Sequence, residues 1–306
     1  MVETTKNRTL PSEAIGSAPV LAGLDRRTFT RMLLAGLFAG RFPSARAGEP
    51  PQPVPECAAP TNGAILVAGG GKLPPEIRNR LIERAGGKKA RVVLLPTADA
   101  DADDMAKRES FYWPGLRESV ASVEWLHTHD RDTADTPAFS ESLDDATCVW
   151  VAGGDQIRLS LAYAGTLVEQ KLHAVLRRGG MVGGTSAGTS ILRRNAIMGG
   201  RETAKLGRGF GLAPSQCFLD QHFKRAGREL RLSGLVHSTP GSVGFGIEEE
   251  TALEIDFLTA MGSVLGNAGV WVYQPDGKKE KRKAGDVFDL RDFGISMPHA
   301  DLAKTP

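Results

Sequence analysis

Gly180-Met181-Val182-Gly183-Gly184-Thr185-Ser186-Ala187-Gly188 is the stretch that decides the fold of this chain. A short apolar run passes through glycines to a serine, and Ser190-Ile191-Leu192-Arg193 follows, which is typical of a strand, a tight turn and a helix. The turn fits G-x-S-x-G, in which a serine hydroxyl stands clear of a sheet and glycines let strand and helix approach closely. The pattern predicts Ser186 as a nucleophile, with the N–H of Ala187 facing a developing oxyanion. On the pentapeptide alone, a glycine-rich turn with an incidental serine explains the pattern equally well.

Apolar runs and amphipathic segments alternate around this turn. Strands are expected at 64–68, 91–96, 121–126 and 148–152, and helices at 76–85, 111–119 and 159–178. Continuous apolar strands that alternate with helices indicate a parallel sheet covered on both faces. The segments at 243–255 and 263–273 look like strands joined by short turns, which predicts an antiparallel C-terminal extension. The expected fold class is therefore α/β, with a mostly parallel sheet sandwiched by helices.

The first 47 residues have the features of an export signal. Asp25-Arg26-Arg27-Thr28-Phe29 contains paired arginines, an apolar stretch covers 32–40, and Ala45-Arg46-Ala47 is a cleavage signal. These features predict a twin-arginine signal peptide over 1–47 and a periplasmic or extracellular destination. The alternative is a basic N-terminus that stays attached. Residues 48–62 are rich in proline and predict an extended linker, which leaves 63–306 as a single α/β domain.

Composition excludes several classes of function. A formal net charge of +2 gives no argument for nucleic acid binding, and no later segment is long and apolar enough for a membrane helix. Three cysteines, Cys57, Cys148 and Cys217, allow at most one disulfide, and no pair has zinc-ligand spacing. Cys148 lies in an apolar strand and is expected in the core.

Two further motifs are weaker signals. Gly69-Gly70-Gly71-Lys72-Leu73-Pro74 follows a strand, but it lacks the third glycine of a dinucleotide fingerprint and the Ser or Thr of a phosphate loop. His127-Thr128-His129-Asp130 has groups that bind metals, but a lone H-x-H after a strand is more often a solvated loop. No metal or cofactor is predicted.

A serine nucleophile needs a base and a group that orients the base. Among six histidines, His222 is the best candidate for the base because it lies in the dense polar block 220–231; a structural histidine is the alternative. The candidate orienting acids are Glu248, Glu249 and Glu250, which follow glycines and an apolar run. In a strand, Glu248 and Glu250 would share one face and Glu249 would point to the other. The alternative for any one of these acids is a solvated strand end.

Four blocks of the chain together resemble the cyanophycinase family, which belongs with the aspartyl dipeptidases among the serine peptidases. The blocks are Val151-Ala152-Gly153-Gly154-Asp155-Gln156, Gly183 to Gly188, Asp220-Gln221-His222-Phe223 and Gly246-Ile247-Glu248-Glu249. They occur in the family's order and approximate spacing, and the resemblance extends from about Gly63 to Tyr273. It implies a fold similar to the class I glutamine amidotransferases (flavodoxin-like), a single serine peptidase domain over 63–306, and a homodimer.

The resemblance also implies roles for individual residues. Ser186 is the implied nucleophile, His222 the base and Glu249 the orienting acid, with N–H groups of Gly154 and Ala187 as the oxyanion hole. The implied substrate-binding residues are Gln156, Asp220, Gln221, Arg228 and Arg231. One departure is Ala226, where the family has an arginine that Arg225, one residue earlier, replaces poorly because a helix turns by about 100° per residue.

The implied activity is hydrolysis of cyanophycin, a poly-aspartate backbone with arginine on each side-chain carboxyl, to β-Asp-Arg through an acyl-enzyme. Arginine forks suit carboxylates, and Asp220 and Gln221 suit a guanidinium. The expected partner is thus a peptide polymer. Two alternatives stay open: a dipeptidase for short aspartyl or isoaspartyl peptides, which the Ala226 departure does not exclude, and an inactive periplasmic binding protein on the same fold.

Overall fold

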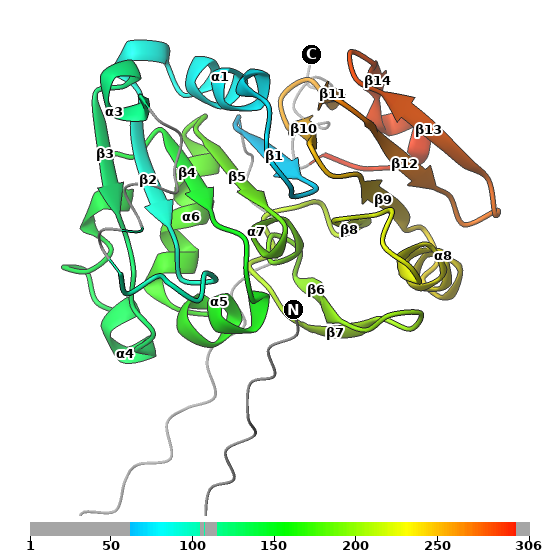
Figure 1. Cartoon of the computed structure of the whole chain (residues 1–306), viewed down its shortest axis with the longest axis horizontal. Helices are drawn as coiled ribbons and strands as arrows, with labels where there is room; N and C mark the ends of the chain where they lie inside the picture. The colour runs from blue at the N-terminus through cyan, green and yellow to red at the C-terminus, as the bar shows by residue number, and fades with distance from the viewer. Residues whose placement is uncertain (1–61, 105–106, 108–114, 298–306) are drawn as a thin grey trace, which may run out of the picture. The chain divides into compact units, whose positions relative to one another are not determined.

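The computed structural model describes residues 62–104, 107 and 115–297 (Figure 1). The predicted signal peptide, nearly all of the predicted linker, Cys57 and residues 111–114 of a predicted helix lie outside the described residues. Within the part of the chain that is described, no helix is both long and apolar enough to cross a membrane. Cys148 and Cys217 are buried free thiols.

The main sheet has eight strands in the order β14-β11-β10-β1-β5-β4-β2-β3. The strands β1, β5, β4, β2 and β3 run parallel, and β10, β11 and β14 join the edge beside β1 as antiparallel strands. Their bounds are β1 Ala64–Ala68, β2 Arg91–Leu95, β3 Ser122–Trp125, β4 Cys148–Val151, β5 Met181–Thr185, β10 Thr251–Asp256, β11 Met261–Gly266 and β14 Val287–Asp289. The predicted α/β class is confirmed.

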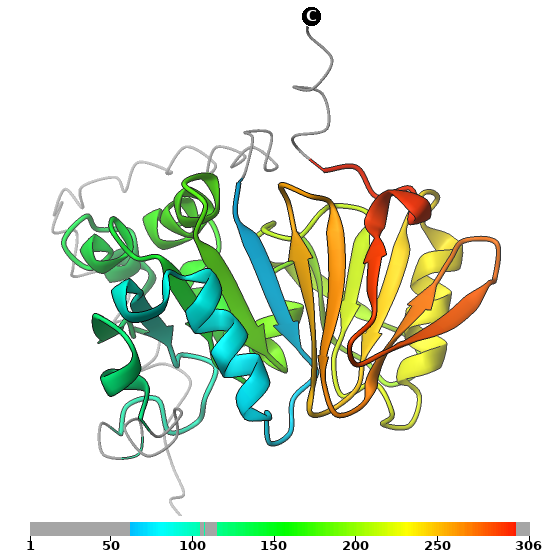
Figure 2. The same cartoon turned by 90° about the horizontal axis from the view of Figure 1, so that it is seen from above.

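Helices cover both faces of the parallel part of this sheet, which explains why β1 and β4 are apolar and buried along their whole length. On one face, Ile65 and Val67 of β1 belong to a core shared with the helices α5 and α6; on the other, Leu66 packs with Ile77 and Leu81 of α1. Figure 2 shows α1, in cyan, against its face of the sheet. The helix bounds are α1 Pro75–Arg84, α3 Leu116–Ser119, α4 Arg131–Ala134, α5 Gln156–Tyr163 and α6 Leu167–Arg177, with 3₁₀ turns η1 Gly87–Lys89, η2 Glu141–Leu143 and η3 Leu290–Phe293.

A second sheet of four strands has the order β13-β12-β9-β8. The bounds are β8 Cys217–Asp220, β9 Val243–Ile247, β12 Gly269–Tyr273 and β13 Lys279–Lys283. On one face, α8 (Arg228–Ser238) packs through Leu232 and Val236 against Phe218. The other face, with Phe245 and Val272, joins the main core. The predicted antiparallel extension is present, although β8 and β9 pair in parallel. A separate hairpin pairs β6 (Asn195–Gly199) with β7 (Lys205–Arg208).

The predicted single helix over 159–178 is wrong, because the chain forms α5 and α6 with a break between them. Gly165 has φ +82°, which glycine adopts easily and other residues rarely do. Its N–H donates to Glu169 Oε2, so the glutamate in the first turn of α6 accepts a bond from the preceding linker. A glycine four residues before a glutamate is the sequence signal for this break.

The predicted strand over 243–255 is also two strands, and they lie in different sheets: β9 in the second sheet and β10 in the main sheet. Glu248, Glu249 and Glu250 form the turn between them, so the predicted alternation of these acids along a strand is wrong. Glu250 has φ +58°. Glu248 is buried, whereas Glu249 and Glu250 are exposed. The change of sheet, rather than the period of a strand, decides where each acid points.

Candidate active site

Ser186 lies at the tip of the turn between β5 and α7 (Ala187–Ser190). Its backbone has φ 53° and ψ −114°, a conformation that residues other than glycine rarely adopt. Glycines make room for the turn: a Cβ on Gly184 would lie 2.5 Å from backbone of Gly188, and a Cβ on Gly188 would lie 2.2 Å from Val151 O. The close packing of helix on strand therefore requires the glycines that the sequence pattern contains.

His222 follows β8 and meets Ser186 across the site. Its Nε2 lies 3.0 Å from Ser186 Oγ, and its Nδ1 bonds Glu249 Oε1. The His222 side chain is largely buried, with 13% of its surface exposed, and burial lowers the pKa of the imidazole while the bond to Glu249 opposes this. The structure thus brings together the three residues predicted as nucleophile, base and orienting acid.

Glu249 is the most exposed of the three, with 46% of its side chain accessible. The hydrogen bond from His222 holds the pKa of its carboxyl below the usual range, and Arg225 Nη2, 3.2 Å from Oε1, acts in the same direction. Glu249 is therefore ionised at neutral pH and keeps Nδ1 of His222 protonated. Arg225, the residue beside the Ala226 departure, points to this carboxylate.

Three successive carbonyls at the end of β1 hold the three site segments. Ser186 N–H donates to Ala68 O (3.1 Å), His222 N–H donates to Gly69 O (2.7 Å), and Glu250 N–H donates to Gly70 O (2.8 Å). A Cβ on Gly70 would lie 2.3 Å from Cε1 of His222. The glycine run after β1 is thus required by the histidine ring and by the backbone bonds around it.

A cavity of about 700 Å³ opens beside Ser186 and His222 at the carboxyl ends of β1, β2, β4 and β5. Ligands bind at this edge in open α/β sheets. Its wall includes Gly154, predicted for the oxyanion hole, and the charged residues Lys72 and Asp99. Sequence reasoning missed Lys72 and Asp99; their position four residues after the ends of the apolar strands β1 and β2 is the signal that identifies them.

The predicted substrate-binding residues lie apart from that cavity wall. Asp220 and Arg231 are buried and pair with each other through two bonds, from Nε to Oδ2 (2.6 Å) and from Nη2 to Oδ1. Burial raises the pKa of Asp220, and Arg231 opposes that change. These two groups therefore satisfy each other, and their contact with substrate stays a prediction.

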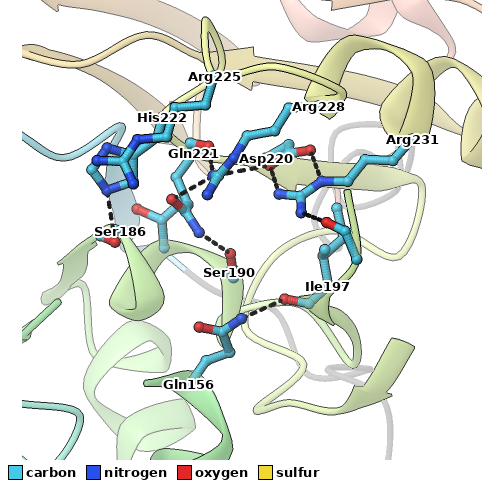
Figure 3. A network of polar contacts seen from close by, with 12 residues as sticks. Gln156, Ser186, Ser190, Ile197, Asp220, Gln221, His222, Arg225, Arg228 and Arg231 are labelled. Atoms are coloured by element: carbon cyan, nitrogen blue, oxygen red, sulfur yellow. Dashed lines mark hydrogen bonds and ion pairs between the residues drawn. The ribbon is translucent and has the colours of Figure 1, made fainter. Parts of the chain in front are cut away.

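Gln221 and Arg228 connect that pair to Ser190, at the end of α7, and not to Ser186 itself. Arg228 Nη1 donates to Gln221 Oε1 (2.8 Å), and Gln221 Nε2 donates to Ser190 Oγ (3.4 Å). Figure 3 shows Gln221 between His222 on one side and the Asp220–Arg231 pair on the other. Gln156, at the start of α5, donates to the backbone oxygens of Ile197 and Met198. It ties α5 to the β6–β7 hairpin.

Comparison with known proteins identifies the family. A family model described as peptidase family S51 matches residues 65–260. A protein named cyanophycinase from Synechococcus elongatus is 31% identical over 70% of this chain and 68% of its own length. A cyanophycinase from a Nostoc species is 29% identical over 70% of this chain and 74% of its own. The chain therefore belongs to peptidase family S51, as the resemblance to the cyanophycinases implied, and is a peptidase.

A solved structure agrees with this fold. A peptidase from an acI-B1 actinobacterium has a TM-score of 0.60 and 23% identity, over 75% of this chain and 97% of that chain. At that identity the likeness shows the fold alone.

Proposed function

We propose that this peptidase hydrolyses cyanophycin to β-Asp-Arg, with Ser186 as nucleophile and an acyl-enzyme as intermediate. The observation that carries the proposal is the 3.0 Å contact between Ser186 Oγ and His222 Nε2 beside the cavity. His222 takes the hydroxyl proton as Oγ attacks the amide carbonyl carbon next to an aspartyl unit. Glu249 stabilises the imidazolium that forms.

In the remaining steps, His222 passes on each proton that it accepts, and the free enzyme is restored. His222 donates the proton to the leaving amine nitrogen, the C–N bond breaks, and the new amino terminus departs. Water then attacks the ester as His222 removes its proton, and the carboxylic acid leaves as Ser186 recovers its hydrogen. We assign the oxyanion to the N–H groups of Ala187 and Gly154; one such donor typically contributes about 3 kcal/mol.

The charged residues around the cavity favour a substrate that carries both positive and negative groups. Lys72 and Asp99 lie on the same cavity wall, so a carboxylate and a guanidinium of one repeating unit each find an opposite charge. Arg228 and Gln221 lie beside His222 in the polar network that Figure 3 shows. The buried Asp220–Arg231 pair belongs to the same network, through the contact of Arg228 with Asp220. The relatives named cyanophycinase support the same substrate class.

The decisive experiment gives purified protein insoluble cyanophycin and identifies soluble products by mass spectrometry. We expect β-Asp-Arg from the wild type. Ser186→Ala should keep its fold and lose activity by about 10³-fold or more, since loss of one triad member removes most of the catalysis. Full cleavage by that variant would exclude Ser186 as nucleophile.

The same assay separates the two other hypotheses. Hydrolysis of Asp-X or β-Asp-X dipeptides with no release from cyanophycin would identify a dipeptidase, the hypothesis that the Ala226 departure leaves open. A binding protein without activity would bind the polymer but resist labelling by a fluorophosphonate probe. Labelling of Ser186 in the wild type excludes that hypothesis.

We further propose that residues 1–47 direct export by the twin-arginine route and that the mature enzyme acts in the periplasm or outside the cell. The motif Asp25-Arg26-Arg27-Thr28-Phe29 supports this proposal. An exported enzyme of this kind would meet polymer released from other cells.

A further inference from the structure

A second group of ionisable side chains lies at the carboxyl edge of the main sheet, outside the serine site. His127 and His129 follow β3, and Asp103 belongs to the loop that follows β2. His127 Nε2 lies 3.0 Å from Asp103 Oδ1, and His129 Nε2 lies 3.4 Å from Asp103 Oδ2. One donor atom from each residue fits within 4.8 Å of the others. The tertiary structure thus adds a carboxylate to an H-x-H motif that offered only two ligands.

We infer that Asp103, His127 and His129 bind a divalent transition metal of the zinc class. Two imidazoles and a carboxylate are the ligands that such ions prefer, with water in the open position. Zinc bonds to these atoms are roughly 2.0–2.2 Å long, so two tetrahedral ligands of one ion lie ~3.3 Å apart. The observed separations of 3.0 and 3.4 Å, which reach different oxygens of Asp103, are close to that value. The three donor atoms lie within 4.8 Å of one another, so a bound ion would draw them closer together.

The surroundings of His127 orient it as a ligand. Its side chain is 5% exposed, and its Nδ1 lies 2.8 Å from Oγ1 of the buried Thr97. Thr97 Oγ1 in turn lies 2.6 Å from the hydroxyl of the buried Tyr163. Histidines that bind metals commonly use the second ring nitrogen in this way, which fixes the ring and leaves the first nitrogen for the ion.

An ion at this position would act on the loop beside the catalytic cavity. Asp99 and Ala100 line that cavity, and Asp103 lies on the same loop only a few residues later. A metal held by Asp103 and the two histidines would join this loop to the end of β3. We therefore expect the ion to stabilise the loop, and its site is separate from the serine, histidine and glutamate described above.

The test uses untagged, full-length protein stripped with EDTA and then dialysed. Isothermal titration with Zn²⁺ should show one site per chain, and Zn²⁺ should raise the melting temperature. His129→Ala and Asp103→Asn should each weaken Zn²⁺ binding by at least about tenfold and remove the thermal shift. Both side chains are substantially exposed, so these replacements leave the core intact.

The matched control is His237→Ala, which removes an exposed histidine on α8 and should bind Zn²⁺ as the wild type does. Wild-type affinity in both His129→Ala and Asp103→Asn would overturn the inference. Loss of Zn²⁺ binding in His222→Ala, with His129→Ala unaffected, would place the ion at the serine site and overturn it too. Absence of binding to wild-type protein would leave the cluster as a histidine–aspartate ion pair.

Discussion

Ser186 and His222 both have a positive φ, of 53° and 48°, which residues with a side chain rarely adopt. Such conformations cost of order 1–3 kcal/mol each in residues with a side chain and persist only where the surroundings enforce them. Here the enforcing contacts are the bonds to Ala68 O and Gly69 O and the packing of Gly70 against the imidazole. Backbone strain is therefore concentrated in the two residues whose side chains meet at 3.0 Å.

Gly70→Ala should damage activity far more than its backbone strain alone explains. The new Cβ would lie 2.3 Å from Cε1 of His222 and displace the ring. Because a shift of about 1 Å in a catalytic group can cost 10²-fold, we expect kcat/KM to fall at least about 100-fold. Kinetics with a soluble Asp/Arg peptide, alongside thermal unfolding, measures both effects.

Gly86→Ala is the matched control for that substitution. Gly86 shares the φ of +104°, but a Cβ there meets nothing within 4 Å. We expect a loss of about 1–3 kcal/mol of stability in both variants and a loss of activity in Gly70→Ala alone. Equal activity in the two would show that the packing of Gly70 on His222 is unimportant.

The acid limb of the pH profile should lie below the ordinary pKa of histidine. Burial lowers the pKa of His222 from 6.5, so the imidazole stays neutral and able to accept a proton at lower pH. Activity is expected to be lost as the pH falls through that lowered pKa. The dependence of kcat/KM on pH reports this group in the free enzyme, and a midpoint above 6.5 would contradict the expectation.

Glu249→Gln should move the same limb further toward acid. The carboxylate favours the protonated imidazole, so its removal lowers the pKa of His222 again. The rate should also fall by about 10²–10⁴-fold, because an amide does not stabilise an imidazolium as a carboxylate does. A limb that moves toward neutral pH would mean that another group controls it.

At the scale of elements, the turn between β9 and β10 positions Glu249 because its neighbour is anchored. Glu248 is 1% exposed and receives bonds from Trp271 Nε1 (2.9 Å) and Lys281 Nζ (2.9 and 2.8 Å). Burial acts to raise the pKa of Glu248, but these donors, Lys281 first, leave it lowered. The buried carboxylate therefore stays charged and attaches the turn to β12 and β13.

Lys281→Met should loosen this anchor while keeping the length of the side chain. A lost hydrogen bond to a charged group typically costs about 2 kcal/mol, and we expect that decrease in the free energy of unfolding. We also expect a lower kcat/KM, since Glu249 directly follows Glu248, the residue that Lys281 anchors. Denaturant unfolding and kinetics check the two effects.

Lys278→Met serves as its control, because Lys278 lies nearby and pairs with Asp276 at the surface. An exposed pair of this kind contributes little, so stability and activity should stay at the wild-type level. If both variants behaved alike, the anchor at Glu248 would not position the turn.

At the scale of the whole molecule, the serine site exists because two sheets meet. Ser186 follows β5 of the main sheet, His222 follows β8 of the second, and Glu249 lies on the chain that passes from one sheet to the other. The shared core, which includes Val67 and Phe245, fixes these parts together. Catalysis should therefore be lost in the same cooperative transition as the tertiary structure.

A second prediction at this scale concerns the N-terminal segment, residues 1–47, which we expect to direct export of the protein. When the protein is produced in a bacterium with a twin-arginine pathway, the mature form should begin at Gly48, because Ala45-Arg46-Ala47 is the cleavage signal. Replacing Arg26 and Arg27 by lysine should leave full-length protein inside the cell. Cell fractionation with intact-mass analysis tests both, and export of the lysine variant would argue against this route.

The sequence by itself determined the α/β class, the serine turn with Ser186, the candidate base His222 and a group of three candidate acids, from which the family resemblance selected Glu249. Those features depend on local periodicity and short motifs, because strand and helix patterns and the glycines of a sharp turn are set by neighbours along the chain. Family resemblance supplied the roles of the histidine and the acid.

Only the tertiary structure decided which distant groups meet. It paired Asp220 with Arg231, brought Lys72 and Asp99 to the cavity, and placed Asp103 beside His127 and His129. The three acids form a turn because β9 and β10 belong to different sheets. Such contacts depend on how sheets and helices pack over long sequence separations, and no periodic pattern along the chain records that packing.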